Sequence, residues 1–341
     1  MKQTLSWGVV GTGGIAADFA AALTRSRRCR IVNVAGRTPE RARAFADRWR
    51  IPRAAASLDD LLADREVEAV YIATPHPFHE ETALAAIAAG KAVLCEKPLA
   101  LDAASSARVI DAARKRGVFL MEGYMYRGHP LMRDVVERLQ AGVIGRIRHV
   151  RADFAFRVPR DPHGRLFATG LGGGGILDVG GYVVSFARLV AGLAEGQRFA
   201  EPIAVAANGV IGPHGADETA TALLTFASRV TATVTAAVFH DAGTCAVVFG
   251  DAGKLVLPDP WIPQGHRQCL ETSYVIHRDG QPPETVRIAT EMATYAIEAE
   301  LVADTLPAVE PAWPAMTWAD TLGNMRVLDA WRAAVLTARA G

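Results

Sequence analysis

A glycine-rich turn near the N-terminus constrains this chain more than any other feature. Residues 11–16 read GTGGIA, follow the apolar run LSWGVV and continue into the helix-forming run IAADFAAALTR. Gly11 permits a tight turn, Gly13 lets a ligand approach the backbone N–H groups, and Ala16 lets the helix pack closely on the strand. The spacing therefore predicts a strand, a phosphate-binding turn and a helix that open a dinucleotide-binding domain.

The pattern of apolar and helical runs changes once along the chain, and this change predicts two domains. Through about Met121 short apolar runs alternate with helical runs, which is typical of a parallel sheet with crossover helices. After a helix expected around 129–141, the runs become longer and rich in β-formers. We predict an α/β Rossmann domain with a parallel, doubly wound sheet over residues 1–122. An α+β domain with a large, mostly antiparallel open sheet should follow over 123–341, and its terminal helices can pack back on the first domain.

Composition excludes several classes of partner. The 341 residues carry a formal net charge of +1 and are 50% hydrophobic, which indicates a globular protein without a basic surface for nucleic acid. The apolar start is short and broken by glycines, and we expect neither a signal peptide nor a membrane span. The four cysteines are scattered, which favours free thiols and a cytoplasmic location.

The end of the second predicted strand bears on which dinucleotide is bound. An acidic residue about 20 positions beyond the glycine turn would bind the ribose 2′-hydroxyl of NAD, but the position 20 after Ala16 is Gly36. Arg37 and Thr38 follow it, and they suit a 2′-phosphate as an ion-pair partner and a hydrogen-bond donor. We therefore expect NADP as cofactor, with NAD possible; the alternative is that Arg37 is a solvated loop residue.

Charged residues stand directly after a predicted buried strand at Cys95-Glu96-Lys97-Pro98. Ligands of open α/β sheets bind at the carboxyl ends of strands, so Lys97 is a candidate acid or base and Glu96 a candidate to orient it or to contact the ribose. Pro98 can fix the turn in the cis form. The alternative is a surface Glu-Lys pair before a helix that starts with proline.

A second glycine run, LGGGGILDVGGY over 171–182, flows into a helix. Consecutive glycines are costly in backbone entropy, which indicates that something approaches the backbone closely. Asp178 and Tyr182 are four residues apart and share a helix face, so Tyr182 can move a proton while Asp178 accepts a hydrogen bond from a substrate hydroxyl or from Lys97. The alternative is a glycine hinge followed by a core tyrosine.

These three elements, in this order and spacing, resemble the glucose-fructose oxidoreductase / inositol dehydrogenase / MocA family over nearly the whole chain. The resemblance implies that Lys97, Asp178 and Tyr182 form the active site. Tyr182 where many members have histidine, together with the MEGYMYRGHP stretch and Arg37, is similar to the branch of dimeric dihydrodiol dehydrogenase and NADP-dependent D-xylose dehydrogenase. The likeness also places the loop after the strand EAVYIA beside the nicotinamide.

The expected function is hydride transfer between nicotinamide and a hydroxyl or carbonyl carbon of a sugar, inositol or cyclic diol. A short-chain dehydrogenase mechanism is excluded, because no Tyr-x-x-x-Lys occurs, and the HxxHE order of His76 and His79 does not predict a metal site. The alternative is a non-catalytic NADP-binding sensor on the same fold. We expect a homodimer or homotetramer through the second sheet.

The expected cofactor-binding residues are Gly11, Thr12, Gly13, Gly14, Ile15, Ala16, Arg37, Thr38, Thr74, Pro75, His79, Glu96 and Lys97. The expected substrate-binding residues are Tyr126, Arg127, Arg165, Asp178 and Tyr182.

Overall fold

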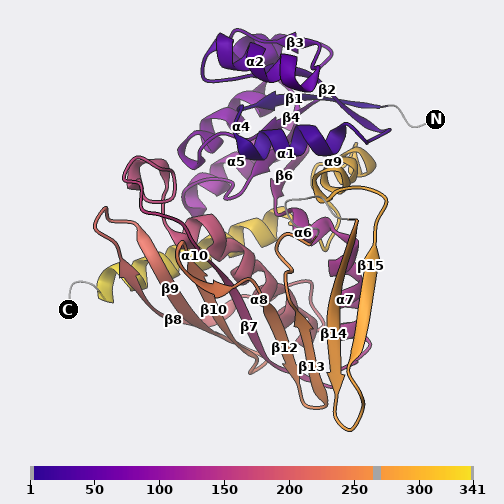
Figure 1. Ribbon diagram of the computed structural model, residues 1–341, viewed down its shortest axis with the longest axis vertical. Coiled ribbons are helices and arrows are strands. Elements are labelled where there is room, and N and C mark those ends of the chain that lie inside the picture. The colour runs from indigo at the N-terminus through magenta and orange to yellow at the C-terminus, as the bar shows by residue number, and fades with distance from the viewer. Residues whose placement is uncertain (1–3, 264–269, 339–341) are drawn as a thin grey trace. The chain divides into compact units, whose positions relative to one another are not determined.

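A computed structural model describes residues 4–263 and 270–338 of the chain (Figure 1). It divides into two compact units. Unit 1 comprises Met1–His129, Gln264–Leu270 and Thr290–Thr321, and unit 2 comprises Pro130–Pro263, Glu271–Ala289 and Leu322–Gly341. Unit 1 thus extends past the domain boundary expected at residue 122 and includes a later segment of the chain.

Unit 1 is built on a parallel sheet. Its strand order, among the described residues, is β3-β2-β1-β4-β5-β6, which is the doubly wound order predicted from the alternating pattern. The order reverses between β1 and β4, and ligands of such sheets bind at this switch point. The strands are β1 Leu5–Val10, β2 Cys29–Ala35, β3 Arg53–Ala54, β4 Ala69–Ile72, β5 Ala92–Glu96 and β6 Leu120–Gly123.

Local sequence signals start and stop the crossover helices of unit 1. Thr38 and Asp102 cap the helices that follow them, since each side chain accepts a hydrogen bond from the backbone N–H three residues on. Gly117 ends α5 in the left-handed conformation, with φ of 67°. The helices are α1 Gly14–Leu23, α2 Pro39–Trp49, α3 Leu58–Ala63, α4 His79–Ala88, α5 Ala103–Arg116, α6 Met125–Gly128 and α9 Thr294–Thr305, and a 3₁₀ turn spans His76–Phe78.

Helix α9 comes late in the sequence but belongs to unit 1, where it packs against α1 and α6. The hydroxyl of Ser26, just after α1, donates to Glu300 Oε1 at 2.6 Å, and Leu301 lies against Gly128 of α6. Aromatic rings fill the interior between α1 and the sheet, with Phe19 stacked on Tyr71 at 3.9 Å between ring centroids. The hydrogen bond between Ser26 and Glu300 joins sequence segments 274 residues apart.

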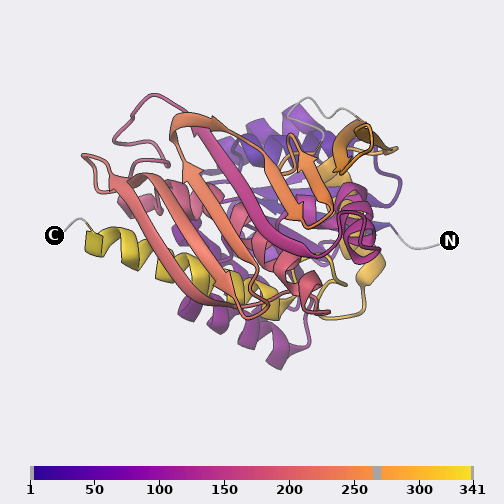
Figure 2. The ribbon, with the colours of Figure 1, turned by 90° about the horizontal axis from the view of Figure 1, so that it is seen from below.

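Unit 2 contains the second sheet, whose strands cross Figure 2 diagonally. The described strands follow the order β15-β14-β13-β12-β7-β10-β9-β8, and β11 also pairs with β7. Only β7 and β10 run parallel among these pairs, so the predicted mostly antiparallel sheet is confirmed. The strands are β7 Ile147–Arg157, β8 Pro202–Ile211, β9 Asp217–Phe226, β10 Thr231–Ala237, β11 Phe239–Gly243, β12 Ala246–Gly250, β13 Gly253–Leu257, β14 Glu271–Arg278 and β15 Glu284–Ala289.

Helix α8 (Gly181–Ala194) packs on β7 and β10, and it is buried along most of its length. A five-residue π-helix, Ile176–Gly180, leads into it. The segment 169–194 is long and apolar enough to cross a membrane, with a mean hydropathy of 1.5 over an 18-residue window, whereas the sequence predicted no such span. Because 94% of that window is buried inside the protein, the segment has the character of a core helix. Unit 2 also contains α7 Pro130–Gln140 and most of α10 Trp318–Ala338.

Candidate active site

The glycine turn after β1 has the geometry that a dinucleotide requires. Gly11 adopts φ of +112°, and a Cβ there would lie 2.5 Å from the backbone oxygen of Ala73 at the end of β4, so only glycine fits. A Cβ on Gly13 or Gly14 would meet nothing within 4 Å. The N-terminus of α1 therefore opens onto free space with no side-chain cap and no acidic residue in its first turn, which suits a pyrophosphate.

The end of β2 lies beside this turn. A Cβ on Gly36 would come within 3.1 Å of both the Thr12 methyl group and the backbone nitrogen of Ala42, so a larger residue is crowded out. Arg37 is exposed, and the Thr38 side chain accepts the N–H of Arg41 at 3.4 Å as the cap of α2. An exposed guanidinium next to a position without a carboxylate fits a 2′-phosphate better than a free 2′-hydroxyl.

The loop after β4 adds a polar atom at the switch point. Thr74 Oγ1 is buried and finds no hydrogen-bond partner among the described residues, and the Thr74 nitrogen lies 3.3 Å from the position a Cβ on Gly11 would take. Pro75 begins the 3₁₀ turn that precedes α4. Together with the half-buried Ile15 and the buried Ala16, these residues fit a nicotinamide dinucleotide at the carboxyl ends of β1 and β4.

The segment that carries Lys97 is held from several sides. The peptide bond between Lys97 and Pro98 is cis, as the sequence allowed. The Tyr71 hydroxyl on β4 donates to Glu96 Oε1 at 2.5 Å, and the Lys97 backbone nitrogen lies 3.4 Å from Glu96 Oε2. Glu96 is thus a buried anchor at the end of β5, and Lys97 itself is half-buried.

His79 joins the two loops at the switch point. Its Nδ1 lies 2.7 Å from the Pro98 carbonyl oxygen and its Nε2 lies 2.8 Å from that of Thr74, and the side chain is 0% exposed. Burial lowers the pKa of His79, although the two carbonyl groups raise it. The sequence predicted a direct contact between His79 and the cofactor; with both ring nitrogens on backbone carbonyls, the structure instead gives it the role of a brace between the loops.

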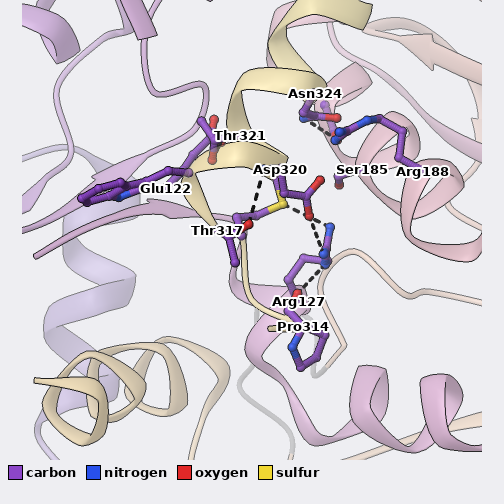
Figure 3. Close-up of polar contacts among 12 residues, drawn as sticks. Glu122, Arg127, Ser185, Arg188, Pro314, Thr317, Asp320, Thr321 and Asn324 are labelled. Atoms are coloured by element: carbon purple, nitrogen blue, oxygen red, sulfur yellow. Dashed lines mark hydrogen bonds and ion pairs between the residues drawn. The ribbon is translucent and has the colours of Figure 1, made fainter. Parts of the chain in front are cut away.

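Glu122 on β6 completes this bracing. Its Oε1 accepts the N–H of Leu99 at 2.9 Å. Its Oε2 accepts the hydroxyl of Thr321, which is labelled beside it in Figure 3, at 2.8 Å. Burial raises the pKa of Glu122 to about 7, although these two hydrogen bonds lower it. The carboxyl group therefore changes charge near neutral pH beside the turn that carries Lys97.

Arg127 is placed in the interior of unit 1. Its Nη2 donates to Asp320 Oδ2 at 2.7 Å and its Nε donates to the Pro314 carbonyl at 2.7 Å, and both charged side chains are 0% exposed (Figure 3). Tyr126 is also 0% exposed. The structure therefore gives Arg127 a buried ion pair rather than the open position expected of a substrate-binding arginine.

Asp178 lies in the π-helix of unit 2, and its side chain is almost fully buried. Arg165, whose side chain is 54% exposed, donates from Nη1 to Asp178 Oδ1 at 2.7 Å. The structure thus brings together two of the predicted substrate-binding residues. The π-helix changes the expected relation between Asp178 and Tyr182, because its wider turn does not place residues four apart as an α-helix does.

Tyr182 stands in the first turn of α8 within an aromatic cluster. Its ring contacts Phe154 of β7 edge-on at 5.3 Å and Trp261 at 6.3 Å between centroids. The Trp261 Nε1 donates to the Asp153 carbonyl oxygen at 2.8 Å, which fixes that ring. The Tyr182 ring is therefore held by packing against Phe154 and Trp261.

The sequence did not single out Tyr71, Glu122 or Asp217, which hold the segments around the predicted site. For Glu122 and Asp217, the sequence offered one signal of such a role: a carboxylate beside a strand pattern that predicts burial. Glu122 follows the run VFLM, and Asp217 precedes the run ETATALL. Among the residues that the structure describes, no cluster of three or more His, Cys, Asp or Glu side chains is placed to hold a metal ion.

Comparison with known proteins gives the same picture over most of the chain. An oxidoreductase family with an NAD-binding Rossmann fold matches residues 5–124, and the GFO/IDH/MocA C-terminal domain matches residues 132–256. Trans-1,2-dihydrobenzene-1,2-diol dehydrogenase from Mus musculus is 38% identical over 263 residues, covering 76% of this chain and 77% of that protein. The human protein of the same name is 36% identical, covering 76% and 77%.

A solved structure agrees across both units. KijD10, a 3-ketoreductase from Actinomadura kijaniata in complex with NADP and TDP-benzene, has a TM-score of 0.85 and 27% sequence identity, covering 98% of each chain. The switch-point turn, the strand order and the two matched domains lead to one conclusion: the chain belongs to the Gfo/Idh/MocA family of NAD(P)-binding oxidoreductases.

Proposed function

We propose that this oxidoreductase transfers a hydride between NADP and the hydroxyl or carbonyl carbon of a sugar, inositol or cyclic diol, with Lys97 and Tyr182 as its proton-transfer groups. One observation carries the proposal. Lys97 stands in a turn that Glu96, His79 and Glu122 hold in place, in the same unit as the open glycine turn. Such bracing is expected for a group that must stay at one position during a reaction.

The roles of the residues follow from the chemistry of alcohol oxidation. Bound NADP supplies the hydride acceptor, so the protein must take the hydroxyl proton and orient the substrate. Lys97 and Tyr182 would move that proton, and Asp178, itself oriented by Arg165, would accept a hydrogen bond from a neighbouring hydroxyl. Tyr126 and Arg127, which the sequence predicted to bind substrate, are not among the proposed substrate contacts, since both are buried.

Replacing Lys97 tests this proposal. Lys97→Met should lower turnover by about 10²- to 10⁴-fold, the usual contribution of general acid–base catalysis, and leave the affinity for NADPH unchanged. NADPH binding is measured by fluorescence titration and turnover by absorbance of the reduced cofactor. Lys115→Met, which changes an exposed lysine of α5 in the same unit, is the matched control. Full turnover by Lys97→Met would refute the assignment.

The choice of NADP rests on Arg37. A charge-assisted hydrogen bond is worth about 1.5–3 kcal/mol, so Arg37→Ala should weaken NADPH binding by roughly 10- to 150-fold and leave NADH binding unchanged. Arg65→Ala, at another exposed arginine of unit 1, should change neither. A lower Michaelis constant for NADH than for NADPH in the unmodified enzyme would overturn the preference.

The relatives suggest the substrates to try first. The mouse and human relatives are named for a dihydrobenzene diol, and the solved 3-ketoreductase for a ketone reduction. A screen of cyclic diols, aldoses and inositols with NADP, and of keto sugars with NADPH, covers both directions of the reaction. The Arg165–Asp178 pair favours substrates with adjacent hydroxyl groups, because a carboxylate can accept two hydrogen bonds at once.

We also propose that two copies pair through the second sheet. By the strand register, the alternate residues of β8 and β9 that share the outer face include Ala206, Asn208, Val210, Thr221 and Leu223, none of which is charged. Val210 is 60% and Leu223 45% exposed, which is typical of an association surface. Leu223→Arg should give a monomer in analytical ultracentrifugation, and an unchanged mass would contradict this surface.

The scattered free thiols suit a cytoplasmic location of the protein.

A further inference from the structure

The second glycine run, Gly172–Gly175, is approached by a side chain from a distant strand. Gly174 adopts φ of +126°, and a Cβ there would lie 2.1 Å from Asp217 Oδ1 at the start of β9. The sequence indicated that something must come close to this backbone. In the structure that group is the carboxylate of Asp217, 41 residues further along the chain than Ile176.

This carboxylate caps the helical segment that carries Asp178. The N–H of Ile176 donates to Asp217 Oδ2 at 2.7 Å, and the backbone of Gly175 also hydrogen-bonds to the carboxylate. Residue Gly175, which stands at the cap position of the π-helix, provides no side-chain hydrogen bond. The first N–H groups of a helix have no partner within it, and a negative charge there is favourable. Asp217 therefore supplies from β9 the cap that the local sequence lacks.

The capped segment is the one on which the proposed reaction depends. The Asp178 backbone nitrogen donates to the Gly174 carbonyl at 3.1 Å, while Arg165 holds the Asp178 side chain at 2.7 Å. Tyr182 follows one turn later. A shift at Gly174 to Ile176 would consequently move the backbone that carries both residues.

We propose that Asp217 is a positioning residue, which acts through the backbone of residues 174–176 to set Asp178 and Tyr182 for the reaction. The inference rests on the proposed function for its catalytic consequence. The geometry of the inference is independent of the proposed function, because every contact involved lies within unit 2. Asp217 touches neither substrate nor cofactor in this role.

The charged surroundings of Asp217 make the role dependent on pH. Arg332 of α10 faces it, the N–H groups of Gly175 and Ile176 face it from the glycine run, and the adjacent Glu218 is turned to Arg160 at 2.6 Å. Burial raises the pKa of Asp217 to about 6, although the N–H groups and Arg332 lower it. A pocket of about 90 Å³ beside the carboxylate, lined also by Thr169 and Ile211, leaves room for solvent.

The direction of the pH dependence follows from this pKa of Asp217. Above about pH 6 the carboxylate is ionised and accepts the N–H groups; below it, the group takes up a proton and loses the charge that favours the helix N-terminus. Turnover should therefore fall as pH drops through about 6. The affinity for NADPH should not follow this change, because the glycine turn of the cofactor site belongs to unit 1.

The test uses the full chain and two readouts. Asp217→Asn should speed hydrogen–deuterium exchange of a peptide spanning 174–182 and lower kcat by about 10-fold, with the Michaelis constant for NADPH within twofold and the fall near pH 6 removed. Asp251→Asn is the matched control, since Asp251 also accepts a backbone N–H, that of Arg146 at 2.8 Å, elsewhere in unit 2. It should leave the 174–182 peptide and kcat unchanged.

A measurement on the unmodified enzyme guards against a variant that does not fold. After correction for the intrinsic pH dependence of exchange, protection of the 174–182 peptide should drop as pH falls through about 6. Unchanged exchange in both experiments, or faster exchange in Asp217→Asn with kcat retained, would overturn the positioning role. If exchange responds as expected but the unmodified enzyme oxidises and reduces none of the screened compounds, the proposed function fails and the hold of Asp217 on the segment stands.

Discussion

Neutralising Asp320 should strongly destabilise unit 1, because it leaves the Arg127 cation buried without a charged partner. Both side chains are 0% exposed, and the guanidinium nitrogen and carboxylate oxygen are 2.7 Å apart. Burial by itself lowers the pKa of Arg127, but Asp320 and Tyr126 together outweigh burial and leave this pKa raised. Breaking a buried pair from one side costs about 3–5 kcal/mol, since the remaining charge has lost its compensation.

The expected effect is a large drop in melting temperature. For a unit of this size about 1 kcal/mol corresponds to 2–4 °C, so Asp320→Asn should lower the transition of unit 1 by roughly 6–20 °C. Differential scanning calorimetry can resolve the transitions of two units. Arg127→Met combined with Asp320→Leu should cost less than Asp320→Asn alone, because apolar groups can replace a buried ion pair without leaving a bare charge.

The control is an ion pair of the same chemistry at the surface of the same unit. Arg114 and Asp111 pair on α5 with both side chains more than half exposed, and such a pair contributes about 0–1 kcal/mol. Asp111→Asn should therefore leave the transition nearly unchanged. If Asp320→Asn shifted the transition no more than Asp111→Asn does, the reasoning about the buried pair would be wrong, and Arg127 would again be a candidate for substrate binding.

Three further outcomes follow from unit 1. The pKa of Glu122 is raised from 4.5 to about 7, so the folded protein keeps this proton to a higher pH than the unfolded chain does. The stability that the protonated carboxyl group contributes is therefore lost as pH rises from about 4.5 to 7. Glu122→Gln should make the melting temperature less dependent on pH in that range. Burial raises the pKa of Glu298, whose carboxylate oxygens have no hydrogen-bond partner among the described residues. Glu298→Leu should raise the melting temperature, more at pH 8 than at pH 5, and an equal loss at both would contradict this. His79→Ala should lower both kcat and the melting temperature, because two loop carbonyls lose their brace; a change in neither would refute the bracing role.

Much of the fold of unit 1 could be predicted because its signals are local. The alternation of apolar and helical runs predicts the parallel sheet, Thr38 caps the helix after β2, and the spacing of GTGGIA predicts the turn that Gly11 makes. The cis bond after Lys97 was also open to prediction, because proline permits it. Each of these features depends on residues a few positions apart, whose physical preferences are the same in any fold.

Only the tertiary structure decided which distant groups lie beside the residues that the sequence had singled out. Arg127 pairs with Asp320, 193 residues later, so an arginine that the sequence assigned to a substrate pocket became part of the core. The glycine run bends around the carboxylate of Asp217, and the turn at Asp178 widened into a π-helix. A sequence pattern states which side chains seek burial or hydrogen bonds. Which distant partner satisfies them depends on chain folding, because buried charges and N–H groups must be paired wherever the fold happens to bring them.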